Sequence, residues 1–328
     1  MFRECGERER ASGQSRLKTG RAGTCTTGRV NRGTERIVRV RIRLHIDVLG
    51  LRCVLWASVA FIVIATLAPA ARAQWMGHQT DCYAPTIQAN PNRPTVANPA
   101  DITQYGVLEL EYGWDQSSLG AGARLSDGEG LLKFGLLCDV ELRWTMTSVL
   151  VENRQAGGQT GTGDNWFGPQ IRFYHQTAHV PTLAFSYAVK APTASTEKGL
   201  GSGRVDHAFV FLASKDIHGV HFDFNTTYFL EGRQLASGFD SRGQMNLSFS
   251  RPIHGKLGFT GEFYGDTELN AENPSFASSL WALTYTITPR LVVDGGIDVG
   301  LTHGAPQKRF FSGVTYSITN LYKDLKKK

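Results

Sequence analysis

Charged residues occur at alternate positions of several strand-like segments, on the side opposite an apolar row. The second to fifth of these segments contribute four basic residues, and the seventh to eleventh contribute five acidic ones. Such rows could line a polar pore and select solutes by charge. We therefore predict that these residues line a pore: Glu109, Glu111, Lys133, Arg143, Arg172, Lys190, Asp223, Glu231, Glu262, Asp294 and Asp298.

The order of these charges along the chain suggests two opposing walls. In a barrel of about twelve strands the basic group and the acidic group would face each other, which would place a transverse field across the pore. Glu141, Asp206 and Arg309 depart from this pattern. The alternative is that the charges pair and fill a small lumen.

Catalytic patterns are weak. Gly161-Thr-Gly-Asp164 and the Gly-rich run before it lack the Lys-Ser/Thr of a phosphate-binding loop, so we expect an external loop there. His175 and His179 would need a third ligand to hold a metal. We expect no catalytic residues, no metal and no cofactor.

Apolar and polar residues alternate through most of the chain after residue 104. Leu108, Leu110, Tyr112 and Trp114 alternate with Glu109, Glu111, Gly113 and Asp115, for example. A period of two predicts strands with two different faces. We predict twelve strands, at 105–115, 130–137, 140–150, 163–174, 182–191, 204–215, 219–231, 243–251, 256–266, 277–288, 290–301 and 308–318.

Strand length and connection length favour a membrane barrel. Segments of this length can cross a bilayer when tilted, and short connections alternate with longer ones. We predict an all-β fold, a closed antiparallel up-and-down transmembrane β-barrel, with the short turns in the periplasm. A soluble β-sandwich is the alternative, because it also alternates. Pro169 lies inside the fourth predicted strand and should shorten or bulge it.

The first 73 residues carry most of the positive charge. They hold 14 Lys and Arg against 5 Asp and Glu, whereas residues 74–328 hold 21 against 24. An uncharged stretch at 53–71 follows several Arg residues and precedes Ala71-Arg72-Ala73. This pattern predicts a signal peptide cleaved between Ala73 and Gln74, with an uncleaved anchor as the alternative. The basic charge therefore indicates export rather than nucleic-acid binding.

Three further segments complete the predicted organisation. Residues 1–47 exceed an ordinary signal-peptide start; translation beginning near Val40 or Val48 and a functional basic arm both account for them. Residues 74–104 predict a Pro-rich periplasmic lead-in, and residues 319–328 a Lys-rich tail. Cys82 and Cys138 remain after cleavage and are candidates for one disulfide, although two cysteines can also stay apart.

Several segments resemble the family named for the meta-pathway of phenol degradation, a group of transporter-like outer-membrane barrels. They are Leu131–Arg143 (LLKFGLLCDVELR), Gly161–Asp164, Ala184–Thr193 (AFSYAVKAPT), Leu200–Asp216 (LGSGRVDHAFVFLASKD) and Gly261–Gly265. The resemblance spans about residues 105–318 and implies passage of small, often aromatic, compounds. One departure is that the chain ends in Lys326-Lys327-Lys328 instead of an aromatic residue, which leaves Tyr316 or Tyr322 as the terminal assembly signal.

Together these observations predict an outer-membrane channel for small, aromatic or hydrophobic, solutes. Its expected partners are outer-membrane lipid, the solute and the barrel assembly machinery. An outer-membrane barrel enzyme and a closed structural or adhesive barrel are the alternatives.

Overall fold

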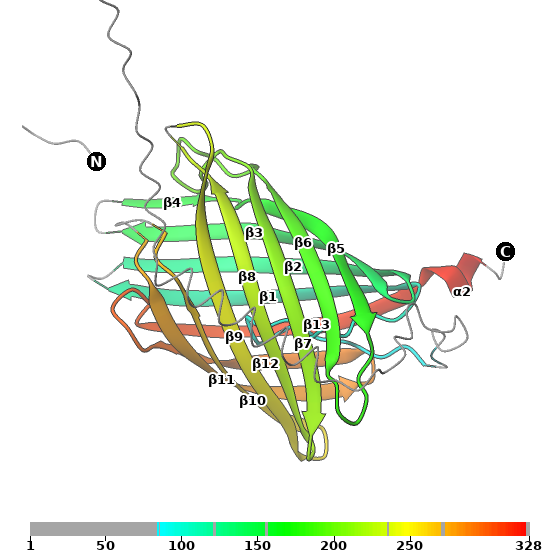
Figure 1. Cartoon of the computed structure of the whole chain (residues 1–328). Coiled ribbons are helices and arrows are strands. Elements are labelled where there is room, and N and C mark those ends of the chain that lie inside the picture. The colour runs from blue at the N-terminus through cyan, green and yellow to red at the C-terminus, as the bar shows by residue number, and fades with distance from the viewer. Residues whose placement is uncertain are drawn as a thin grey trace, which may run out of the picture. The chain divides into compact units, whose positions relative to one another are not determined.

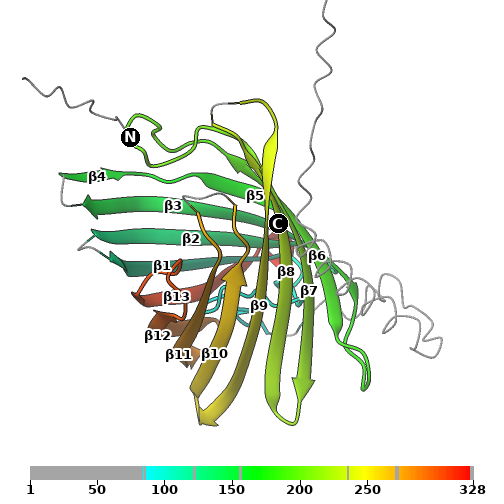
Figure 2. The same cartoon turned by 60° about the vertical axis from the view of Figure 1, so that its left-hand side comes forward.

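The described part of the chain forms a closed antiparallel transmembrane β-barrel (Figures 1 and 2). The computed structural model describes residues 84, 86–120, 123–154, 157–234, 236–269 and 273–325. The predicted leader, its predicted cleavage site and Cys82 lie outside the described residues. Strands that follow one another along the chain pair, except β4 with β5, and pairing of the first strand with the last closes the ring.

Thirteen strand elements make up the barrel. They are β1 Val107–Gly120, β2 Ala123–Leu137, β3 Val140–Arg154, β4 Gly157–Gly161, β5 Asn165–Tyr174, β6 Thr182–Ala191, β7 Asp206–Ile217, β8 Val220–Gly232, β9 Phe239–His254, β10 Leu257–Asp266, β11 Phe276–Thr288, β12 Leu291–Gly300 and β13 Lys308–Asn320.

β4 and β5 occupy one position in the ring. Both pair with β3, β4 along residues 150–154 and β5 along residues 140–146. The barrel therefore has the twelve predicted strands. Residues between them leave the ladder. There the Asp164 carboxylate accepts the backbone N–H of Ala194 at 2.9 Å, so the interruption supports the neighbouring connection.

The strands have one apolar and one polar face, as the alternation predicts. In contrast to a soluble protein, the apolar face is exposed and the polar face is buried. Trp114 is 44% exposed and Leu283 50%, whereas Glu109 is 0% exposed. Apolar side chains toward lipid and polar side chains toward the lumen are typical of a transmembrane barrel. One closed sheet with this distribution excludes the β-sandwich.

Several strands extend further than the apolar rows predict. The predicted connection 116–129 belongs largely to β1 and β2, which pair from Leu108–Phe134 to Gly120–Ala123. Beyond the lipid belt an outward side chain need not be apolar, while the backbone ladder continues, so the alternation ends before the strand does. Pro169 lies within β5 opposite Leu142 of β3. The prediction that it shortens or bulges the strand is wrong, because the β5–β6 register is the same on both sides of it, at Phe167–Val189 and Gln170–Ser186.

The short turns gather at one end of the barrel, where β1 also begins and β13 ends. β13 runs to Asn320, and the short helix α2, Leu321–Leu325, follows it. Tyr322 packs against Tyr105 with ring centroids 4.8 Å apart and the rings tilted by 52°. The Lys323 amine donates to the backbone carbonyl of Ala84 at 3.1 Å. Among the described residues, no helix is both long and apolar enough to cross a membrane.

Candidate functional site in the barrel lumen

Residues 86–105 enter the lumen and return to its short-turn end (Figures 1 and 2, cyan). Near the start, the N–H of Ala89 donates to the carbonyl of Pro289 in the β11–β12 turn. Near the end, the N–H of Thr103 donates to Glu141 of β3 at 2.6 Å. Ala97 and Ala100, between them, are fully buried. The segment predicted as a periplasmic lead-in therefore lies inside the barrel, because the inward rows offer partners to its polar backbone.

Inward side chains of the barrel bind the backbone of this lumen segment. Three prolines interrupt positions 90–100, and seven of the eight other residues donate their N–H at 2.6 to 2.9 Å. The donors are Asn90, Asn92, Arg93, Val96, Ala97, Asn98 and Ala100, and the acceptors, in that order, are Glu109, Glu111, Glu111, Glu262, Glu262, Asn225 and Ser214.

Side chains within the lumen segment hold it folded back on itself. Asn90 donates through its amide to the carbonyl of Asp101 at 3.2 Å, and Asn92 donates to the side chain of Asn98. The Thr95 hydroxyl bridges the carbonyls of Asn92 and Ala97 at 3.1 and 2.8 Å. The segment is thus a narrow polar hairpin whose outer edge faces the barrel.

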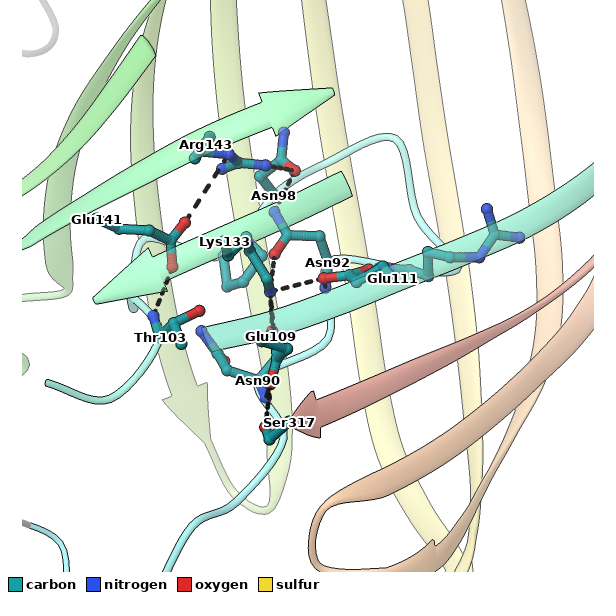
Figure 3. A network of polar contacts seen from close by, with 12 residues as sticks. Asn90, Asn92, Asn98, Thr103, Glu109, Glu111, Lys133, Glu141, Arg143 and Ser317 are labelled. Carbon is teal, nitrogen blue, oxygen red and sulfur yellow. Dashed lines mark hydrogen bonds and ion pairs between the residues drawn. The ribbon is translucent and has the colours of Figure 1, made fainter. Parts of the chain in front are cut away.

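Lys133 is the centre of the most buried charge cluster (Figure 3). Its amine lies 2.7 Å from Glu109 and 2.6 Å from Glu111, and all three side chains are essentially inaccessible. The same amine donates to the carbonyl of Asn90 and, at 2.7 Å, to the side chain of Asn92. Buried charges need compensating partners, and these contacts supply them from two strands and the lumen segment.

Arg93 extends its side chain from the lumen segment over the seam between β1 and β13. Its guanidinium is 3.3 Å from Asp294 and 3.9 Å from Asp115. It lies over Gly113 and Gly313, which pair with each other across β1 and β13. A Cβ at either glycine would come within 2.2 Å of the Arg93 side chain, so the missing side chains make room for it.

Seven of the eleven predicted pore residues contact the lumen segment: Glu109, Glu111, Lys133, Arg143, Arg172, Glu262 and Asp294. The other four contact barrel residues. Lys190 pairs with Asp206, Asp223 accepts from Ser214 at 2.6 Å, Glu231 is 2.9 Å from Arg242, and Asp298 is 3.0 Å from Arg309.

The contacts do not show a basic wall facing an acidic wall. Each of the four basic residues has a carboxylate nearby: Lys133 has Glu109, Arg143 has Glu141 at 3.8 Å, Arg172 has Asp139 at 3.0 Å and Lys190 has Asp206. Lys133 and Glu109 are direct partners in the β1–β2 register. Desolvation in a narrow lumen favours such local pairing over separated charge.

Two cavities flank the lumen segment. One, of about 290 Å³, is lined by Glu129, Arg309 and Phe311. The other, of about 560 Å³, is bordered by Pro289, and hydroxyl side chains of β9, β10 and β11 make up most of its barrel side. Arg93, Pro94 and Thr95 line both cavities, so the lumen segment forms the wall between them.

The one histidine in this lining does not form a nucleophile pair. His221 lies 2.8 Å from Asp216 and 3.0 Å from Asp223, and the hydroxyls of Ser214 and Ser248 reach Asp223 instead of the imidazole. The described residues contain no group of three or more His, Cys, Asp and Glu side chains that could hold a metal ion.

Cys138 is disulfide-bonded at the β2–β3 turn. Cys82, its predicted partner, lies outside the described residues, and that pairing stays a prediction.

The contacts that side chains of the lumen segment make with the barrel were not predicted from the sequence. Arg93 stood in a segment with no period, so nothing indicated a direction for its side chain. Ser214, Asn225 and Gln170 are neutral and were not distinguished from other inward polar residues. Their inward phase was readable from alternation, but their partner was not.

A closed antiparallel barrel with a polar interior and an apolar belt defines the class of outer-membrane β-barrels. Within that class, the chain belongs to the Phenol_MetA_deg family, described as the MetA-pathway of phenol degradation, whose model matches residues 77–318. The resemblance seen in the sequence is thus confirmed. A search of curated protein sequences found no match to this chain.

Solved structures share the fold at low sequence identity. An outer membrane channel from Pseudomonas putida F1 has a TM-score of 0.53 and 11% identity, covering 72% of this chain and 99% of its own. NanC porin has 0.44 and 11%, covering 64% and 100%. Outer membrane phospholipase A from Escherichia coli has 0.40 and 13%, covering 70% and 96%. The first of these likenesses shows the fold.

Proposed function

We propose that the protein is an outer-membrane channel for small solutes. One observation supports this proposal: the lumen holds a segment of the chain and two cavities. In a closed structural barrel, the inward side chains of the strands would fill the lumen by themselves. Cavities of a few hundred Å³ match the size of small-molecule sites. Glu111, Arg143 and Asp223, three of the eleven predicted pore residues, line one or the other cavity, which supports the proposal.

The lining favours solutes that combine an apolar ring with polar groups. Leu280, Ala282 and Phe311 form a buried apolar cluster, and Phe311 borders the smaller cavity beside Arg309 and Glu129. The family description, which refers to phenol degradation, supports the same class. Small hydroxylated aromatic compounds are therefore the proposed solutes.

Location and partners follow from the same reading. The signal peptide, cleaved between Ala73 and Gln74, would deliver the chain for export, and the barrel assembly machinery would insert it. The apolar belt would then contact outer-membrane lipid.

Solute flux into liposomes tests the proposal. The full chain and a variant lacking residues 88–103 would be reconstituted, and uptake of 4-hydroxybenzoate compared with uptake of glucose. We expect flux above that of protein-free liposomes, fastest for the aromatic acid and in the shortened variant, because removing the lumen segment joins the cavities. Absence of flux from both proteins would overturn the channel, as would turnover of phospholipid or ester by the purified protein.

A further inference from the structure

We propose that the barrel lumen is a binding site for an extended polypeptide backbone. Residues 90–103 occupy the site within the same chain and close the pore. A free peptide of the same sequence would occupy it once the resident segment is removed. The ligand class is an extended, proline-containing peptide without excess negative charge.

The site recognises the backbone more than the side chains of its occupant. Glu111 accepts the successive N–H groups of Asn92 and Arg93, one on each carboxylate oxygen. Glu262 does the same for Val96 and Ala97, at 2.7 and 2.6 Å. A carboxylate that accepts two adjacent N–H groups needs an extended or turned backbone but no particular side chain.

Backbone carbonyls of the occupant are bound as well. Gln170 donates its amide to the carbonyl of Pro99 at 2.9 Å, and Asn225 donates to that of Asn98 at 2.9 Å. Asn225 also accepts the Asn98 N–H, so one side-chain amide binds both backbone groups of one residue. Because the lumen side chains bind both N–H and carbonyl groups, the site would favour a peptide over a simple amine or anion.

The prolines fit the spacing of the acceptors. Pro91, Pro94 and Pro99 have no N–H, and each stands next to residues whose N–H groups are bound. They keep the backbone extended and lower the entropy lost on binding. Carboxylates supply most acceptors, which favours an occupant that is neutral or cationic near them, as Arg93 is.

The contacts allow the occupant to leave. Its buried apolar residues are few and mostly small, among them Ala97, Ala100 and Ile102, and Ala100 packs against Ala184 and Leu212. Most of its other contacts are hydrogen bonds and ion pairs to inward polar side chains, and water that enters the lumen can replace them. A segment held in this way differs from a barrel core, whose removal would expose apolar surface.

Peptide binding to the shortened protein tests the proposal directly. The variant lacking residues 88–103 would be titrated in detergent with a fluorescent peptide of residues 88–104, QANPNRPTVANPADITQ. We expect saturable binding by anisotropy. A peptide N-methylated at Asn92 and Ala97 keeps every side chain but loses two bound N–H groups, and should bind at least about tenfold more weakly. Equal binding of the methylated peptide would overturn backbone recognition.

The full chain provides a second test that needs no deletion. Glu262→Gln replaces one acceptor oxygen with a donor facing an N–H, and should raise the open fraction of single channels in planar bilayers. Asp266→Asn is the matched control: it makes the same change on the same strand, and its carboxylate contacts Arg242 and Gln244 instead of the lumen segment. Equal opening in both variants would overturn pore closure by the segment.

The two tests separate this proposal from the channel function. Peptide binding without any conductance would leave the site intact and remove the channel. Conductance of the full chain equal to that of the shortened variant would leave the channel intact and remove the closure.

Discussion

Lys133 shows how a charged residue can be both buried and structural. Its amine is shared by Glu109, Glu111 and the lumen segment, so two carboxylates depend on one cation. Removing one partner of a buried ionic cluster leaves uncompensated charge, which costs more than the intact cluster contributes.

Lys133→Met should therefore destabilise the folded barrel by about 3–5 kcal/mol. The measurement is urea unfolding followed by the difference in gel mobility between folded and unfolded protein. Lys198→Met is the control, because Lys198 is exposed and its amine donates to the carbonyl of Thr160 at 3.0 Å. Its effect should stay within about 0.5 kcal/mol. Equal midpoints for the two variants would contradict the role of Lys133.

Sequence alone could predict that Glu109, Glu111 and Lys133 point inward, because a strand has a strict period of two. The β1–β2 register makes Lys133 and Glu109 direct partners, and sequence does not show register. Arg93 was out of reach for a different reason: a proline-rich segment has no period and so indicates no direction for its side chains.

Among the elements, β5 and β6 approach each other closely at Gly168. A Cβ placed on Gly168 would lie 1.7 Å from the carbonyl oxygen of Tyr187, and backbone cannot move aside as a flexible side chain can. Gly168 also precedes Pro169, which removes a ladder N–H at the next position. The proline led us to predict an irregularity in this part of the strand. The contact at Gly168 shows that the β6 backbone lies close to β5 at this point.

Gly168→Ala should destabilise the barrel by about 1–3 kcal/mol, because β5 must shift away from β6. Gly295→Ala in β12 is the matched control, since the nearest atom to its added Cβ is 3.5 Å away, an ordinary contact. Thermal conversion from the folded to the unfolded gel band reports both. A Gly295 variant that melts as early as the Gly168 variant would argue against this reason.

At the scale of the whole molecule, the outer face must match a bilayer. Leu283 lies near the middle of β11 and is half exposed, and its register partners are Phe259 and Gly295. The strand number and this outward row were predictable because both follow from alternation. The contents of the lumen were not, because they arise from a segment outside the alternating region.

Leu283→Arg should make folding into phosphatidylcholine vesicles less favourable by about 2–4 kcal/mol, the cost of a charge near the bilayer midplane. Equilibrium folding across a urea series measures it, with Leu283→Phe as the apolar control. In detergent micelles, which deform around a charge more readily, the difference should shrink. An arginine variant that folds into vesicles as well as the phenylalanine variant would place this face away from lipid.

The position of both ends of the lumen segment has a consequence for assembly. The chain near Ala84 and the start of β1 lie at the same rim, where α2 also ends. The described segment therefore enters as a folded-back loop, with both of its ends at this rim. β1 and β13 can complete their seam before or after the loop arrives. Insertion and withdrawal consequently require neither threading nor opening of the closed sheet.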